Sequence, residues 1–212
     1  MSDATGPLPS VKVPSNSASN PFSSRNIRPG AIPFLFAADE EPAQIVEQLH
    51  AAAWWGEIVG PHGSGKSALV AALAPYWAAA GRRLVSISLH DGQRHLRAFT
   101  RDLSTVDHQC LVIVDGYEQL SWLSRWRLKR LCRRRGCGLL VTSHEPVGLP
   151  RLYTMRPSAP TAERIVAGLV DLESGVIHRD DVERLFEIRG GNLREMLFDL
   201  YDLYEERRHR RA

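Results

Sequence analysis

The sequence predicts a doubly wound, mostly parallel α/β sheet that is followed by a small helical lid. Two observations carry this prediction. Short apolar strands alternate with helical segments between residues 57 and 155, which is the pattern of a parallel sheet with helices on both faces. Beyond about residue 160 the periodicity becomes wholly helical, so no further strand is expected there.

Composition sets broad bounds on the protein. The chain has 212 residues, 43% apolar and 24% charged, enough for one sizeable core and a small appendage. Its formal charge of +3 is too small to imply a nucleic-acid partner by itself. The three cysteines form no C-x-x-C pair and are expected to be reduced. No apolar run approaches the ~18 residues of a membrane span, and the polar, proline-rich start is no secretory signal, so we expect a cytoplasmic protein without membrane insertion.

Three segments are expected along the chain. Residues 1–20 are rich in Ser, Pro and Asn, cannot bury enough surface to offset their ordering entropy, and are expected to be a disordered tail. Residues 21–158 are expected to form the α/β domain, which begins with an ordered arm of aromatic and turn residues. Residues 159–212 are expected to form the helical lid.

The elements of the α/β domain follow from local patterns. Strands are expected where residues are β-branched and alternate or form a continuous apolar run: 57–59, 84–89, 110–114, 138–142 and 152–155. Helices are expected between them, with Pro42 as a start signal and Gly81 and Gly136 as stops: 43–53, 67–80, 93–103 and 118–135.

A complete G-x-x-x-x-G-K-[ST] string connects the first strand to the helix that follows it. In this setting glycines let backbone N–H groups wrap a phosphate at a helix N-terminus. Lys66 would reach the β- and γ-phosphates, and the Ser67 hydroxyl would hold Mg²⁺. A glycine turn before a core helix is the alternative, but the strand–loop–helix context favours a nucleoside triphosphate. The expected ligand contacts are Gly60, Pro61, His62, Gly63, Ser64, Gly65, Lys66, Ser67 and Ala68.

Two carboxylates near the end of the strand 110–114 are candidates for metal binding and proton transfer. Asp115 ends this strand, where a carboxylate can bind Mg²⁺ directly or through water. Glu118 either accepts a proton from an attacking water or simply favours the N-terminus of the next helix through the macrodipole. Asp91 is a weaker alternative base.

Polar residues also end the next strand. Thr142, Ser143 and His144 follow an apolar run and would lie beside the phosphate loop, where such side chains orient water or contact the γ-phosphate. The alternative is that they only cap the strand before a turn.

Arg194 lies in the first turn of a C-terminal amphipathic helix whose buried stripe contains Leu193, Leu197, Leu200 and Leu203. A cation at this helix end is unfavourable to the dipole and requires an anionic partner, either a carboxylate or the nucleotide γ-phosphate.

With these four sites in order, the chain resembles the P-loop ATPases that include AAA+ and related signalling (STAND) or origin-recognition ATPases. The likeness spans roughly residues 28 to 205. Gly60–Ser67 matches their Walker A motif, and the strand that ends at Asp115 is similar to Walker B. The resemblance implies ATP and Mg²⁺ as ligands.

The sensor segments of that family have counterparts here. Thr142 or Ser143 lies where sensor 1 would be, and residues 191–195 are similar to sensor 2, whose arginine contacts the γ-phosphate. The strand end also resembles the switch-histidine strand of ABC ATPases, which makes His144 a candidate γ-phosphate contact. A serine-glycine signature of an ABC subunit does not precede Asp115.

Two departures from the family bear on activity. ATPases of this architecture carry a glutamate directly after the Walker B aspartate, whereas here the glutamate comes three residues later, and fast hydrolysis is not expected. Only residues 145–150 separate the sensor 1 strand from the last strand, which leaves no room for an arginine-finger helix, so a ring-forming motor is not expected.

Seven basic residues lie between Arg125 and Arg135, with Trp122 and Trp126 interleaved. The face is either the solvated side of an amphipathic helix or a docking surface for nucleic acid or an acidic protein. The inward stripe is expected to contain Leu120, Leu123, Leu128 and Leu131.

The sequence therefore predicts an Mg-ATP-binding protein, a slow ATPase that couples nucleotide state to lid position. Lys66, Glu118, Ser143 and Arg194 are the expected catalytic residues. The alternative is a nucleotide-gated binding module that barely turns over and acts through a protein or nucleic-acid partner. A small-molecule kinase is a third interpretation, which the sensor-like segments argue against.

Overall fold

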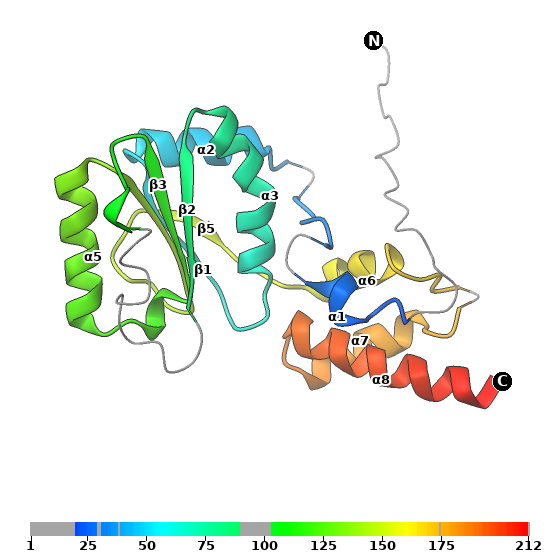
Figure 1. Cartoon of the computed structure of the whole chain (residues 1–212). Coiled ribbons are helices and arrows are strands. Elements are labelled where there is room, and N and C mark those ends of the chain that lie inside the picture. Colours follow the sequence, from blue (N-terminus) through cyan, green and yellow to red (C-terminus); the bar gives the residue numbers. More distant parts are fainter. Residues whose placement is uncertain (1–19, 29–30, 38, 90–102, 174, 212) are drawn as a thin grey trace, which may run out of the picture. The chain divides into compact units, whose positions relative to one another are not determined.

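The computed structural model describes residues 20–28, 31–37, 39–89, 103–173 and 175–211 (Figure 1). The chain divides into two compact units, Pro33–Arg156 on the one hand and Met1–Ile32 with Pro157–Ala212 on the other. Residues 1–19 of the expected tail, Asp91 and nearly all of the expected helix 93–103 lie outside the described residues, whereas Asn20, the last residue of that tail, is described and buried. None of the described helices is both long enough and apolar enough to cross a bilayer.

The α/β unit is built on one five-stranded, all-parallel sheet with the strand order β2-β3-β4-β1-β5. This confirms the predicted fold class. Its described elements are α2 (Pro42–Ala51), β1 (Trp55–Val59), α3 (Lys66–Ala79), β2 (Arg83–Ser88), β3 (Cys110–Asp115), the 3₁₀ turn η2 (Tyr117–Gln119), α5 (Trp122–Arg135), β4 (Gly138–Ser143) and β5 (Arg151–Thr154).

Helices cover both faces of the sheet, with α5 on one face and α2 and α3 on the other (Figure 1). Alternate residues of the central strand β3 enter the two cores, because successive side chains of a strand point to opposite faces. Val112 and Val114 pack in the cluster that contains Leu128 of α5, whereas Leu111 and Ile113 pack in the cluster with Trp77 of α3.

The carboxyl ends of the central strands bring the expected site segments to one edge of the sheet. β1 pairs with β4 up to Val59 and Ser143, and β3 pairs with β4 up to Val114 and Val141. In parallel α/β sheets ligands bind at this edge. The phosphate loop follows β1, Asp115 ends β3, and the polar residues end β4.

The helix after β3 begins later than the sequence predicts. Gly116 has a left-handed conformation, with φ of 81°, and a 3₁₀ turn follows it. Ser121 then caps α5 by accepting a hydrogen bond from the backbone N–H of Ser124, so the helix proper starts at Trp122. Glu118 therefore lies in the 3₁₀ turn and not at the N-terminus of the helix.

The buried stripe of α5 also differs from the one that the sequence predicts. Ser124, Leu128 and Cys132, spaced four residues apart, are buried, while Leu131 is partly buried. Leu123 was expected to face the core, but its position falls outside this stripe and it is exposed.

The helical unit contains α1 (Ser24–Ile27), α6 (Ala159–Ala167), α7 (Arg179–Ile188) and α8 (Leu193–Arg211). The predicted stripe of α8 is confirmed: Leu193, Leu197 and Leu200 are buried and Leu203 packs against them. The end of α8 is tied down, because Arg207 donates hydrogen bonds to both oxygens of Asp181, at 2.5 and 2.8 Å.

The first part of the N-terminal arm belongs to the helical unit, whereas the sequence assigned it to the α/β domain. Phe22 is fully buried in the helical core, which explains the difference. Asn20 Nδ2 donates to the carbonyl of Tyr201 at 3.0 Å and to Glu205 Oε1 at 2.8 Å. The later arm residue Phe34 packs instead in the α/β unit, against Tyr153.

Candidate functional site

The loop between β1 and α3 has the backbone shape that its glycines allow. Gly63 and Gly65 adopt left-handed conformations, with φ of 66° and 95°. A Cβ on Gly60 would lie 2.4 Å from the Cβ of Met155, so only glycine fits there. Ser64 is buried, and its hydroxyl has no hydrogen-bond partner among the described residues. The loop therefore offers backbone and an unpaired hydroxyl to a ligand, as a phosphate cradle requires.

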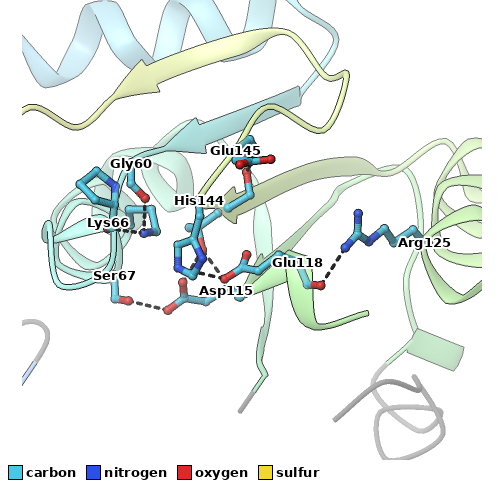
Figure 2. Close-up of polar contacts among 12 residues, drawn as sticks. Gly60, Lys66, Ser67, Asp115, Glu118, Arg125, His144 and Glu145 are labelled. Carbon is cyan, nitrogen blue, oxygen red and sulfur yellow. Dashed lines mark hydrogen bonds and ion pairs between the residues drawn. The ribbon is translucent and has the colours of Figure 1, made fainter. Parts of the chain in front are cut away.

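Lys66 is held inside this loop. Its ammonium donates hydrogen bonds to the carbonyl oxygens of Gly60, at 2.7 Å, and Pro61, at 2.8 Å (Figure 2). The Lys66 residue is buried, which is unusual for a lysine. A phosphate can replace these carbonyls as a stronger, charge-assisted acceptor.

Asp115 connects the ends of three elements. The Ser67 hydroxyl at the start of α3 donates to Asp115 Oδ2 at 2.5 Å (Figure 2). The hydroxyl of Thr142, at the end of β4, donates to Asp115 Oδ1 and accepts from the backbone N–H of Gly116 at 3.0 Å. A hydroxyl and a carboxylate in contact beside a phosphate loop suit Mg²⁺, which takes few protein ligands and keeps waters and phosphate oxygens.

Glu118 points toward His144, and His144 lies against the phosphate loop (Figure 2). Glu118 Oε1 is 3.1 Å from His144 Nε2, and the ring centroids of His144 and His62 are 3.4 Å apart. The second oxygen, Glu118 Oε2, is buried without a hydrogen-bond partner among the described residues. The histidine pair thus connects the displaced glutamate with the loop.

The surroundings of His144 favour its uncharged form. Burial lowers its pKa, and the nearby cation of Lys66 and the ring of His62 lower it further, although Glu118 and Glu145 act in the opposite sense. A neutral imidazole that contacts a carboxylate through Nε2 carries its proton on that nitrogen and donates it to the carboxylate.

Arg125 fixes the turn that carries Glu118. Its guanidinium donates to the backbone carbonyls of Glu118, at 2.7 Å, and Leu120, at 2.9 Å. Its carbon Cζ also lies 5.3 Å from the ring centroid of Tyr117. Burial raises the pKa of Tyr117 to about 12. The turn is therefore held by the buried ring of Tyr117 and by the hydrogen bonds that Arg125 of α5 donates to its carbonyl groups.

Of two further expected site residues, Ser143 makes its contact elsewhere and Arg194 belongs to the other compact unit. Ser143 is buried at the end of β4, but its hydroxyl donates to the carbonyl of Glu145 at 2.6 Å, so it is Thr142, and not Ser143, that donates to Asp115 from this strand. Arg194 begins α8 in the other compact unit. No carboxylate lies within 4.0 Å of its guanidinium among the described residues, so the structure provides no protein anion there.

Sequence analysis missed the role of Glu57, a buried carboxylate in β1. It accepts hydrogen bonds from the backbone N–H groups of Val147, at 2.8 Å, and Leu149, at 3.2 Å, and from Arg151 Nε at 3.0 Å. These bonds hold the short β4–β5 connection that carries His144 at its start. The sequence signal that could have indicated this role is the presence of one acidic residue, Glu57, in an otherwise apolar strand.

Comparisons with known proteins agree with this architecture. A RuvB mutant from Thermotoga maritima is 14% identical over 74% of this chain and 60% of its own, with a TM-score of 0.51. A DNA replication initiation factor is 18% identical over 79% and 62%, with a TM-score of 0.52. The Hsp104–ADP complex of S. cerevisiae is 13% identical over 85% and 32%, with a TM-score of 0.55. No protein-family model and no curated protein sequence matches the chain.

These three structures are AAA+ P-loop ATPases, so the predicted resemblance is confirmed at the level of the fold. The chain covers less than two thirds of each of them. The fold is one that nucleotide-binding ATPases use, and its phosphate loop lies where those folds bind their ligand.

Proposed function

We propose that this protein binds Mg-ATP at the loop from Gly60 to Ser67 and hydrolyses it slowly. The observation that carries the proposal is the contact of Ser67 with Asp115, at 2.5 Å, directly beside a loop that holds Lys66. Adenine as the base is supported only by the related fold of Hsp104, whose structure contains ADP.

Each residue has a distinct role in this proposal. Lys66 exchanges its loop carbonyls for phosphate oxygens and neutralises their charge. Ser67 and Asp115 hold Mg²⁺, which supplies charge stabilisation at the phosphates when it is bound. Glu118 accepts the proton of the attacking water, and Thr142 keeps the Asp115 carboxylate oriented.

Slow turnover follows from the contacts of Glu118. A general base must be within hydrogen-bond reach of the water it deprotonates. Here one carboxylate oxygen is engaged by His144, and only Oε2 is unpaired. The same contact favours the alternative function, a nucleotide-gated module that acts through a partner and barely hydrolyses ATP.

The first experiment measures phosphate release from Mg-ATP together with nucleotide affinity, for the full chain and for Lys66→Ala and Glu118→Gln. An ATPase loses binding or turnover with Lys66→Ala and loses turnover alone with Glu118→Gln. Equal trace rates for the full chain and Glu118→Gln, with tight binding, identify the module. Phosphate transfer to an added acceptor would identify a kinase, and absence of binding would refute the proposal.

Coupling to the helical unit has its own test. We propose that Arg194 contacts the γ-phosphate, because it begins a helix without a carboxylate partner among the described residues. Arg194→Ala should then weaken ATP binding about tenfold, the loss of one charge-assisted hydrogen bond, and leave ADP binding unchanged. The exposed Arg164→Ala in α6 is the matched control. Equal losses for ATP and ADP would refute this role.

A further inference from the structure

The outer face of α5 leaves two tryptophans open to solvent. Trp122 is 79% exposed and Trp126 is 52% exposed, and the neighbouring Leu123 is 38% exposed. The opposite side of the helix, with Leu128 and Cys132, is fully buried in the core. Tryptophan is on average highly buried in folded proteins, so two open indoles on one well-anchored helix are unusual.

The same face carries positive charge without acidic neighbours. The sequence has no Asp or Glu from Gln119 to His144. In the part of the chain that the structure describes, no carboxylate lies within 4.0 Å of four exposed arginines of α5: Arg127, Arg130, Arg134 and Arg135.

Internal contacts account for the remaining cations of the helix. Lys129 donates to the carbonyl of Val147 at 3.3 Å, and Arg133 lies over the ring of Trp55, 5.4 Å from its centroid. Burial lowers the pKa of Lys129, and the neighbouring Arg133 and Arg125 lower it further. Neighbouring cations of α5 therefore repel one another, as at Lys129.

The helix spacing places aromatic and cationic groups in one line. Trp122, Trp126, Arg130 and Arg134 follow at four-residue intervals, which corresponds to steps of about 6 Å along one side of an α-helix. The Arg130 Cζ lies 5.3 Å from the ring centroid of Trp126. The tryptophan end and the arginine end thus form a continuous surface, the α5 stripe.

We propose that the α5 stripe, together with the neighbouring exposed Arg127, binds single-stranded nucleic acid, with Trp122 and Trp126 stacking on bases and Arg127, Arg130 and Arg134 contacting phosphates. Open aromatic faces beside a row of cations are the combination that binds single strands without sequence preference. Nearly all the cations are arginine, whose planar group both stacks and pairs with phosphate. A duplex fits less well, because its bases are already stacked on one another.

Two other partners fit the stripe less well. A membrane surface requires a broad apolar face, but the apolar side of α5 is turned into the core and only Leu123 joins the tryptophans outside. An acidic peptide would form ion pairs with the arginines but has no aromatic ring that could stack on the two indoles. The proposal concerns the surface alone and does not depend on ATP hydrolysis.

Fluorescence anisotropy of a labelled oligothymidine, titrated with the full chain without nucleotide, tests the proposal. Binding should quench tryptophan emission and weaken steeply with salt. Trp122→Ala and Trp126→Ala should each reduce affinity roughly fivefold or more. Arg127→Gln with Arg130→Gln should reduce the slope of log affinity against log salt by about 1.4, which is about 0.7 for each phosphate contact to a single strand. Tyr76→Ala, at an exposed ring of α3, should bind the oligonucleotide like the wild-type protein.

Four results would overturn the proposal. These are no binding of the oligonucleotide, binding that survives loss of both tryptophans, equal binding of a duplex of the same length, and binding of polyglutamate or phosphatidylserine vesicles in place of the oligonucleotide. Because both tryptophans are exposed, their alanine variants should keep the melting temperature of the unchanged chain, which shows that a lost affinity is not a lost fold.

Discussion

Asp115 is the residue at which the parts of the site meet. Its two carboxylate oxygens take hydrogen bonds from Ser67, which starts α3, and from Thr142, which ends β4. Thr142 also accepts from the Gly116 N–H, so one hydroxyl satisfies both the carboxylate and the turn that follows it. A change at Thr142 therefore affects the orientation of the Asp115 carboxylate, which we propose as a metal ligand, without changing that ligand itself.

Thr142→Val tests this arrangement. Valine keeps the volume but cannot donate to Asp115 or accept from Gly116, so two partly buried polar groups lose a partner and the free energy of unfolding should fall by about 1–3 kcal/mol. Affinity for ATP should fall more in the presence of Mg²⁺ than in its absence. Denaturant unfolding and nucleotide titration measure both, and Thr142→Ser, which keeps the hydroxyl, should restore them. Unchanged Mg²⁺ dependence in Thr142→Val would contradict the role.

His144 gives the site a pH dependence whose sign follows from its lowered pKa. Above the ordinary value of about 6.5 the ring is neutral in both the folded and the unfolded chain, and its contribution to stability is fully present. As pH falls through the folded pKa, the ring becomes a cation and that contribution is lost. The charged ring also pairs more strongly with Glu118, so the rate should decline on the acid side.

Phosphate release measured against pH tests this prediction. In the wild-type protein the rate of phosphate release should decrease as the pH falls below about 6.5. In His144→Gln, whose side chain cannot titrate, this decrease should weaken or shift. His209→Gln, at an exposed histidine of α8, is the matched control. An acid limb that is identical in His144→Gln would assign the titration to another group.

At the scale of elements, β1 does more than lead into the phosphate loop. The β4–β5 connection has backbone N–H groups that no strand pairs, and the Glu57 side chain accepts hydrogen bonds from two of them and from Arg151. The connection starts at the residue that contacts Glu118. The shape of the site at the sheet edge therefore depends on a carboxylate inside a strand.

Glu57→Ala should lower the free energy of unfolding by about 3 kcal/mol, because a charge-assisted network loses the carboxylate that its three donors share, and the N–H groups of Val147 and Leu149 lose their partner. Hydrogen exchange should show faster exchange of these two amides. Glu57→Gln keeps one carbonyl acceptor and should lose less. If Glu57→Ala lowered the free energy of unfolding by no more than a surface substitution does, about 0.5 kcal/mol, water would have replaced the carboxylate as the acceptor.

At the scale of the whole molecule, the chain passes between its two compact units twice, near Ile32 and near Arg156. The residues before the first passage are part of the helical core, because Phe22 is buried among α6, α7 and α8 and Asn20 is bonded to α8. The helical unit thus has two tethers to the α/β unit, and its stability depends on a segment far from it in sequence.

Phe22→Ala should destabilise the helical unit by about 3–5 kcal/mol, the cost of removing a fully buried phenylalanine. Limited proteolysis and hydrogen exchange should report increased opening of α6–α8 and no change in the sheet. Phe198→Ala, at a partly exposed ring on α8, is the control and should have a small effect. Equal opening of both units would show that they unfold as one.

Local sequence patterns determined the alternating strands and helices, the phosphate loop and the carboxylate at the end of β3. These depend on side-chain period, glycine conformation and hydrogen bonding within a few residues, which are written in consecutive positions. The expected helix bounds were accurate to within a few residues except after β3, where Gly116 and the Ser121 cap inserted a turn.

Only the tertiary structure decided which residues meet. It paired Thr142 and not Ser143 with Asp115, folded Glu118 back onto His144, gave Glu57 its role in the β4–β5 connection, and placed Phe22 in the helical core. These contacts join segments that are distant along the chain, so they depend on strand order and on the packing of whole elements, which no local pattern records. The tryptophans of α5 illustrate the same limit, because the packing of the helix buries Ser124, Leu128 and Cys132 and leaves Leu123 outside with the tryptophans.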